Sequence, residues 1–149
     1  MLIDSHAHIL SLEEPYEAIK RASDEGVGKI ISIGTGIESS RDTVELTKKY
    51  NGIYASVGIH PHAASSYSPD LMNEFEQLLD DPKVVAIGET GLDYFYLNST
   101  KEEQFESCEA HVDLATKHNL PFVIHVRDAD SDMIDFFKTK DMNESPGVI

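Results

Sequence analysis

Five of the seven histidines of the chain follow closely on short apolar segments that have the character of β-strands: His6, His8, His60, His62 and His125. His6 and His8 are two residues apart. Side chains at positions i and i+2 of an extended chain point to the same side. These two imidazoles can therefore converge on one cation, at metal–nitrogen distances of about 2.0–2.1 Å. The spacing predicts a metal site, and a hydrogen-bonded strand end is the alternative interpretation.

Glu89 is the candidate carboxylate of the same site. It follows an apolar segment and lies between Gly88 and Gly91. A carboxylate in that place is partly buried, which costs free energy unless the group is paired or bound to metal. Because it has two oxygens, it can bridge two cations. A salt bridge to a helix is the alternative, but the glycines favour a close approach of the backbone.

His125 is predicted to be a fourth ligand, because it ends the apolar segment Phe122–Ile124. The alternative is a hydrogen-bonded core histidine. Three other candidate ligands at neighbouring strand ends make this alternative less favoured than a metal ligand. Arg127 lies two residues further on and can bind a phosphate oxygen through its planar guanidinium group. An ion pair with Asp128 or Asp130 is an equally good interpretation of Arg127.

The remaining histidines carry weaker predictions. His60 lies nearer its strand than His62 does, and we expect it to contact substrate or transfer a proton. A structural role in the loop is equally compatible with its position. His111 and His118 fall within a predicted helix and are interpreted as surface or packing residues without chemistry. Asp93 is expected at the rim of the pocket.

The candidate residues must be positioned by alternating strands and helices. The strands are predicted from apolar segments rich in Ile and Val, which are typical of strands buried on both faces: Leu2–Ile3, Lys29–Gly34, Ile53–Gly58, Val84–Gly88 and Pro121–His125, with a sixth beginning at Gly147. Helices are predicted from Pro15 to about Gly26, from Ser40 to Tyr50, after Ser68, after Thr100, and from Ser131 to Lys140. This alternation implies parallel strands with right-handed crossovers, in an open sheet or a barrel. In both, chemistry lies at the carboxyl ends of the strands.

The composition of the chain argues against several classes of protein. The chain has 27 acidic and 12 basic residues and a formal charge of −15, which argues against a protein that coats nucleic acid through its own cations. Cys108 is the only cysteine, so an internal disulfide is excluded. We see neither a signal peptide nor about 18 consecutive apolar residues that could span a bilayer, and we expect a cytoplasmic protein without a membrane partner.

Four blocks of this sequence resemble, in order, the signature blocks of TatD-like metal-dependent deoxyribonucleases: Asp4–His8, Gly58–His62, Gly88–Tyr94 and Pro121–Ala129. The resemblance implies an α/β fold of the (βα)8 TIM-barrel type with two divalent metal ions, Mg²⁺, Mn²⁺ or Zn²⁺. It places His6, His8 and Glu89 on the first metal. It makes Glu89 the bridging, catalytic ligand to the second metal, which His125 also binds. The implied activity is metal-dependent hydrolysis of phosphodiester bonds, with DNA as the substrate of an exonuclease.

A (βα)8 barrel typically needs about 250 residues. We therefore expect residues 1–149 to form a single incomplete barrel domain, with strands one to five and the start of strand six. We also expect weak metal binding, little or no activity of the isolated chain, and self-association of the open half-barrel through exposed strand edges. A metal-dependent amidohydrolase and a non-catalytic remnant are the alternatives. The block Gly88–Tyr94, with a glutamate as the bridge, favours the nuclease.

Overall fold

A computed structural model describes residues 1–140 and 147–148 of the chain. Six strands form one sheet, in which each strand is hydrogen-bonded in parallel to the next strand of the sequence. They are β1 (Leu2–Ala7), β2 (Val27–Ile33), β3 (Ile53–Val57), β4 (Val84–Asp93), β5 (Phe122–Arg127) and β6 (Gly147–Val148). The predicted sixth strand is thus present at its first two residues, and Ile149 lies outside the described residues.

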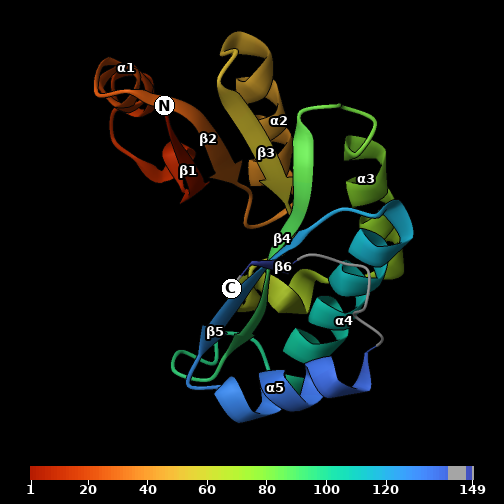
Figure 1. The fold of residues 1–149 in the computed structure, drawn as a ribbon. Helices are drawn as coiled ribbons and strands as arrows, with labels where there is room; N and C mark the ends of the chain where they lie inside the picture. Colours follow the sequence, from red (N-terminus) through yellow and green to blue (C-terminus); the bar gives the residue numbers. More distant parts are fainter. Residues whose placement is uncertain (141–146, 149) are drawn as a thin grey trace.

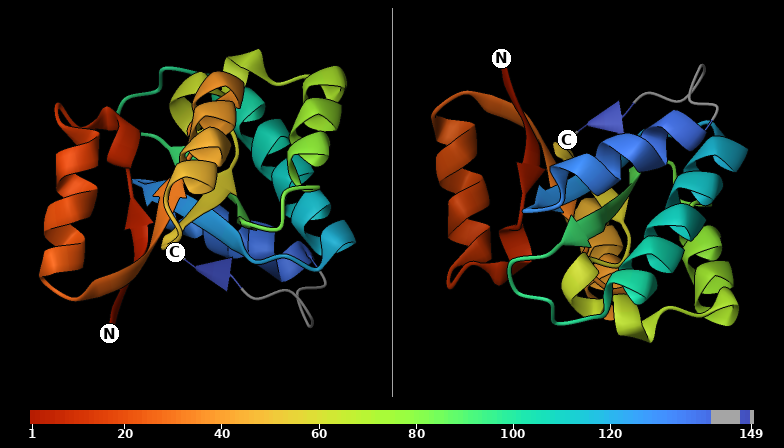
Figure 2. Two further views of the ribbon diagram at one scale, coloured as in Figure 1. Left: turned by 90° about the horizontal axis from the view of Figure 1, so that it is seen from above. Right: turned by 90° about the horizontal axis from the view of Figure 1, so that it is seen from below.

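The connections between the strands are helical. They are η1 (Ile9–Ser11), α1 (Pro15–Asp24), α2 (Ile37–Lys49), η2 (Pro61–Ser66), α3 (Pro69–Leu78), α4 (Lys101–His118) and α5 (Asp130–Thr139), where η marks a short 3₁₀ helix. The sheet curves like part of a barrel wall, and the α-helices lie along its convex side (Figure 1, Figure 2). Helix α2 packs on β3 and α4 packs on β4. The predicted α/β class and the parallel order of the strands are confirmed.

Local capping explains why two helices begin where the sequence predicts. The Ser68 hydroxyl accepts a hydrogen bond of 3.2 Å from the N–H of Leu71 at the start of α3. At the start of α4 the Thr100 hydroxyl accepts from the N–H of Glu103, and the Glu103 carboxylate accepts from the N–H of Thr100. These bonds satisfy N–H groups that have no partner inside a helix.

The predicted start of α2 was wrong. The helix begins at Ile37, three residues before Ser40, because the Ser39 hydroxyl accepts from the N–H groups of Thr35 and Gly36. Ser40 is itself buried inside the helix.

Three strands extend beyond their predicted ends. β1 continues to Ala7, β4 to Asp93 and β5 to Arg127. The apolar segments stop where the first polar side chain appears, but the backbone pairing continues, with Asp93 in register with Arg127. Most of the candidate site residues therefore lie within strands, where the sheet fixes their direction, and not in the loops that follow.

The main core lies between the sheet and helices α2 to α5, and it includes Phe75, Ile87, Leu92 and Val112. Cys108 belongs to it as predicted, and burial raises the pKa of its thiol to about 12. A smaller core, which includes residues of α1, β2 and α2, completes the packing at the other end of the sheet. Within residues 1–140 and 147–148, no helix is both long and apolar enough to cross a membrane.

Candidate metal centre

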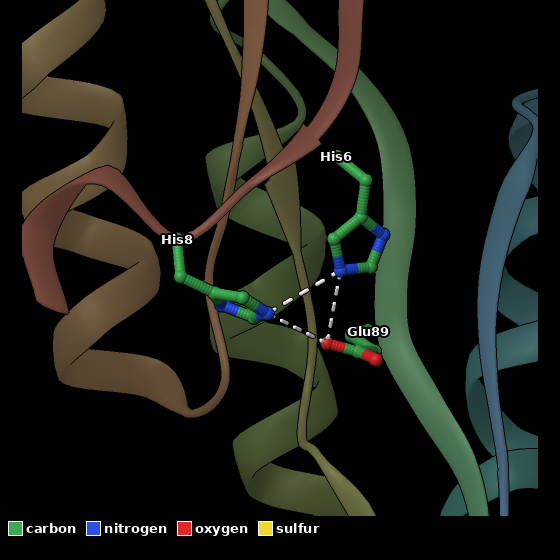
Figure 3. Close-up of side chains that lie close together, drawn as sticks. All are labelled: His6, His8 and Glu89. Atoms are coloured by element: carbon green, nitrogen blue, oxygen red, sulfur yellow. Dashed lines mark hydrogen bonds and ion pairs between the residues drawn. The ribbon is translucent and has the colours of Figure 1, made fainter.

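The side chains of His6 on β1, His8 just after β1 and Glu89 on β4 point toward one another (Figure 3). The Nε2 atoms of His6 and His8 are 3.3 Å apart, and they lie 3.5 and 3.4 Å from Oε2 of Glu89. Three ligand atoms that surround a cation tetrahedrally at about 2.1 Å lie about 3.4 Å from one another. The triangle formed by His6, His8 and Glu89 therefore has the dimensions of one face of a metal site.

Glycine neighbours bring Glu89 into this place. Gly88 and Gly91 have φ angles of +122° and +134°. A Cβ atom at Gly88 would lie 2.3 Å from the carbonyl oxygen of Val123, and one at Gly91 would lie 2.1 Å from that of His125. Only glycine combines this conformation with so close an approach of β4 to β5. The Gly88–Glu89 peptide bond is cis.

The Glu89 carboxylate is buried, and Oε2 accepts no hydrogen bond from the residues that the structure describes. Burial alone raises the pKa of Glu89, but the hydrogen bond with His125 and the nearby imidazoles of His60 and His6 outweigh it, so the pKa is lowered. An ionised, buried oxygen without a hydrogen bond is costly unless a cation lies beside it. The residues thus fit a divalent metal. The alternative prediction, a salt bridge from Glu89 to a helix, is not found in the described part of the chain.

The other oxygen of Glu89 faces a second group of ligands. Nδ1 of His125 lies 3.3 Å from Oε1 of Glu89 and 3.3 Å from Nε2 of His60. The two carboxylate oxygens thus face two different sets of imidazoles, as a carboxylate that bridges two cations would. Burial lowers the pKa of His60 to about 4, so its imidazole is neutral and offers a lone pair to a metal. The sequence predicted that His60 contacts substrate or transfers a proton, with a structural role in the loop as the alternative. The structure places it among the possible ligands.

Asp93 is a further candidate site residue, which the sequence placed only at the rim of the pocket. It is fully buried and does not lie at a rim. Its Oδ2 atom lies 2.8 Å from Nε2 of His62 and 3.0 Å from Nε2 of His125. Burial raises the pKa of Asp93, but the Tyr96 N–H and the two imidazoles outweigh it and bring the pKa to about 2. One signal could have revealed it: Asp93 is four residues after Glu89, so in an extended β4 both carboxylates face the same side.

Arg127 is exposed and lies beside the metal centre without joining it. Its guanidinium carbon lies 4.0 Å from the centre of the Phe95 ring and 4.7 Å from that of Tyr96. Within the described residues, the predicted ion pair with Asp128 or Asp130 is not found. The guanidinium group therefore keeps its hydrogen-bond donors available for an anion. The two remaining histidines, on α4, have no place in the site.

Sequence comparison decides the family. The model of TatD-related DNases matches residues 3–149. The chain belongs to this family. It is 35% identical to a metal-dependent hydrolase of Bacillus subtilis named YabD, over all of this chain and 60% of that protein. It is 33% identical to the 3′-5′ ssDNA/RNA exonuclease TatD of Klebsiella pneumoniae, over 89% of this chain and 50% of that protein.

Solved structures of TatD homologues have the same fold. YJJV from Escherichia coli K12 is 29% identical, with a TM-score of 0.86 over 97% of this chain and 57% of that one. A TatD-family hydrolase of Entamoeba histolytica is 28% identical, with a TM-score of 0.83 over 99% of this chain and 57% of that one. The partial TIM barrel predicted for this TatD-family chain is thereby confirmed. The chain spans 60% of the length of the Bacillus subtilis relative.

Proposed function

We propose that this chain supplies part of a two-metal site that hydrolyses phosphodiester bonds of single-stranded nucleic acid from an end. The arrangement of Glu89 carries the proposal, because its Oε2 faces His6 and His8 while its Oε1 faces His125. A carboxylate placed in this way could be shared by two cations, which together would act on one phosphate group. The name of the Klebsiella pneumoniae relative, a 3′-5′ ssDNA/RNA exonuclease, supports the choice of substrate and the action from an end.

Each residue of the site has a defined task in this proposal. His6, His8 and Glu89 would hold one cation, and Glu89, His125 and His60 would hold another. Bound divalent metals would activate a water molecule and offset the charge of the phosphate. Imidazole-rich ligand sets favour Zn²⁺ or Mn²⁺ over Mg²⁺, which prefers oxygen ligands. Arg127 lies on the neighbouring strand end, where its guanidinium can bind a further phosphate oxygen.

The acidic character of the chain is consistent with this mechanism. With a formal charge of −15, the protein repels nucleic acid over most of its surface. Two bound divalent cations would reverse the local charge where the phosphate must sit. Binding would then depend on metal to a degree that a basic nuclease does not show.

Metal titration of the purified chain tests the proposal directly. Calorimetric titration with Zn²⁺ and Mn²⁺ should show two ions per chain, and Glu89→Gln should weaken both by at least about tenfold, because it removes the shared charge. The matched control is Glu13→Gln, an exposed glutamate outside the site. Cleavage of end-labelled single-stranded DNA, expected to be weak for this chain alone, should require metal and be lost in Glu89→Gln. A chain that binds no divalent cation, or a Glu89→Gln variant with unchanged affinity, would refute the proposal.

A further inference from the structure

We propose that Phe95, Tyr96 and Arg127 form a subsite, the aromatic platform, that stacks an unpaired nucleobase beside the metal centre. The inference rests on the proposed function and adds what holds the strand in place. Phe95 and Tyr96 are the second and third residues after β4 and are 55% and 52% exposed. Their ring centroids are 4.7 Å apart, with the rings nearly perpendicular. Two large aromatic rings exposed side by side offer a binding surface for another flat apolar group.

The guanidinium of Arg127 completes the platform. It lies over both rings, at 4.0 Å from the Phe95 centroid and 4.7 Å from the Tyr96 centroid. Bases of single-stranded nucleic acid stack on aromatic rings and on the planar guanidinium group of arginine. The positive charge also suits a strand whose backbone is anionic. A nucleobase with its attached phosphate matches both properties of this surface, whereas a purely apolar partner would leave the charge of Arg127 unused.

The platform is tied rigidly to the metal centre through a single buried carboxylate. Oδ1 of Asp93 accepts hydrogen bonds from the N–H groups of Phe95 (3.1 Å) and Tyr96 (2.9 Å). Oδ2 of the same side chain contacts His62 and His125. The two regions therefore have a fixed relative position, as a subsite for one nucleotide requires.

Ring contacts continue from the platform into the site. The Tyr96 ring packs edge-on against His62 at 5.1 Å between centroids, and His62 lies 6.2 Å from His125. A strand with one phosphate at His125 would thus have a neighbouring base close to Tyr96. Stacking would also add affinity that electrostatic attraction does not supply, because the chain carries few cationic side chains to attract phosphates. One stacked base raises affinity roughly 5- to 150-fold.

Paired oligonucleotides test the inference by binding, with no need for turnover. The probes are single-stranded DNA pentamers with phosphorothioate linkages, in Mn²⁺. One has bases throughout, and the other has abasic tetrahydrofuran residues at its last two 3′ positions. The wild-type chain should bind the first probe roughly 5- to 150-fold more tightly. A terminal 2-aminopurine should lose fluorescence on binding because it stacks. Equal affinity for both probes would overturn the inference.

The variants distinguish stacking on the two aromatic rings from general effects of substitution on binding or folding. The double variant Phe95→Leu, Tyr96→Leu keeps apolar bulk and should bind both probes alike, whereas Tyr96→Phe should keep the preference. Tyr16→Leu removes an aromatic of similar exposure from α1 and should behave as wild type. An unchanged thermal midpoint verifies that each variant is folded, and a preference retained by the double variant would overturn the inference. Failure of the proposed function is distinguishable, because titration with Zn²⁺ and Mn²⁺ would then show no bound divalent cation, whatever the affinity for the two probes.

Discussion

At the scale of single residues, Asp93 connects the candidate metal centre to the loop that follows β4. One oxygen orients His62 and His125, and the other holds the backbone of the loop after β4. Carboxylates that accept a hydrogen bond from a metal-binding histidine fix the orientation of the ring and increase its basicity. We therefore propose that Asp93 positions His125, and we expect its substitution to change the affinity for metal.

Asp93→Asn is expected to lower the affinity of the His125 metal position about 10- to 100-fold, because the variant loses the charge that faces two imidazoles. The affinity of the position formed by His6, His8 and Glu89 should change far less. Titration with Zn²⁺ resolves the two positions. The matched control, Asp42→Asn, changes an exposed residue of α2 and should leave both affinities alone. Two unchanged binding constants in Asp93→Asn would contradict the positioning role.

Four candidate ligands were predictable from the sequence. His6, His8, Glu89 and His125 lie at the carboxyl ends of β1, β4 and β5, and parallel strands bring those ends together. Their spatial convergence is confirmed, while their role as metal ligands stays a prediction. Asp93 was placed at a rim because the apolar pattern predicts the end of β4 at Gly88, whereas the strand continues to Asp93.

At the scale of elements, the order of strands and helices followed from apolar periodicity and capping residues, but element boundaries did not. Backbone pairing ends where a neighbouring strand ends, and the neighbour is known only from the fold. The start of α2 depends on the hydroxyl of Ser39, which accepts two backbone N–H groups. A serine in that position is ambiguous in the sequence, because it forms such bonds in turns as readily as at helix starts.

The contact between α4 and the segment after β3 is made by His111, and it predicts how the stability of the fold depends on pH. His111 is fully buried, Nε2 accepts a 3.0 Å hydrogen bond from the N–H of Ile59, and Nδ1–H donates to the carbonyl of Ser107. Burial lowers the pKa of His111 from 6.5 to about 4. Below about pH 6.5 the unfolded chain therefore takes up a proton that the folded chain does not. The contribution of His111 to the free energy of unfolding is complete above that pH and is lost as the pH falls towards 4.

Urea denaturation of the wild type and of His111→Gln measures this effect. Between pH 7 and pH 5 the unfolding free energy of the wild type should fall by about 2 kcal/mol more than that of the variant. His60, whose pKa is also lowered to about 4, contributes equally to both proteins and cancels in the comparison. Parallel pH profiles for the two proteins would show that His111 is not protonated on unfolding.

At the scale of the whole molecule, an open sheet edge favours self-association and a large negative charge opposes it. Within residues 1–140 and 147–148, β1 pairs with β2 alone, and Leu2 and Ile3 are 63% and 59% exposed. Unpaired strand edges with apolar side chains pair readily with another chain. The formal charge of −15 opposes that contact through repulsion between copies. At physiological ionic strength, salt screens this repulsion at distances beyond about 8 Å.

We expect the chain to self-associate through β1, more strongly at high salt than at low salt. Sedimentation velocity over a range of protein concentrations should show a weight-average mass that rises with concentration and with added salt. Ile3→Lys should reduce the association, because it places a charge on the exposed strand. Ile134→Lys adds the same charge at an exposed position of α5, 55% accessible, and so separates the effect of site from that of net charge. If both variants reduce association equally, the effect does not depend on where the lysine lies and β1 is not the contact; a monomer under all conditions would exclude association altogether.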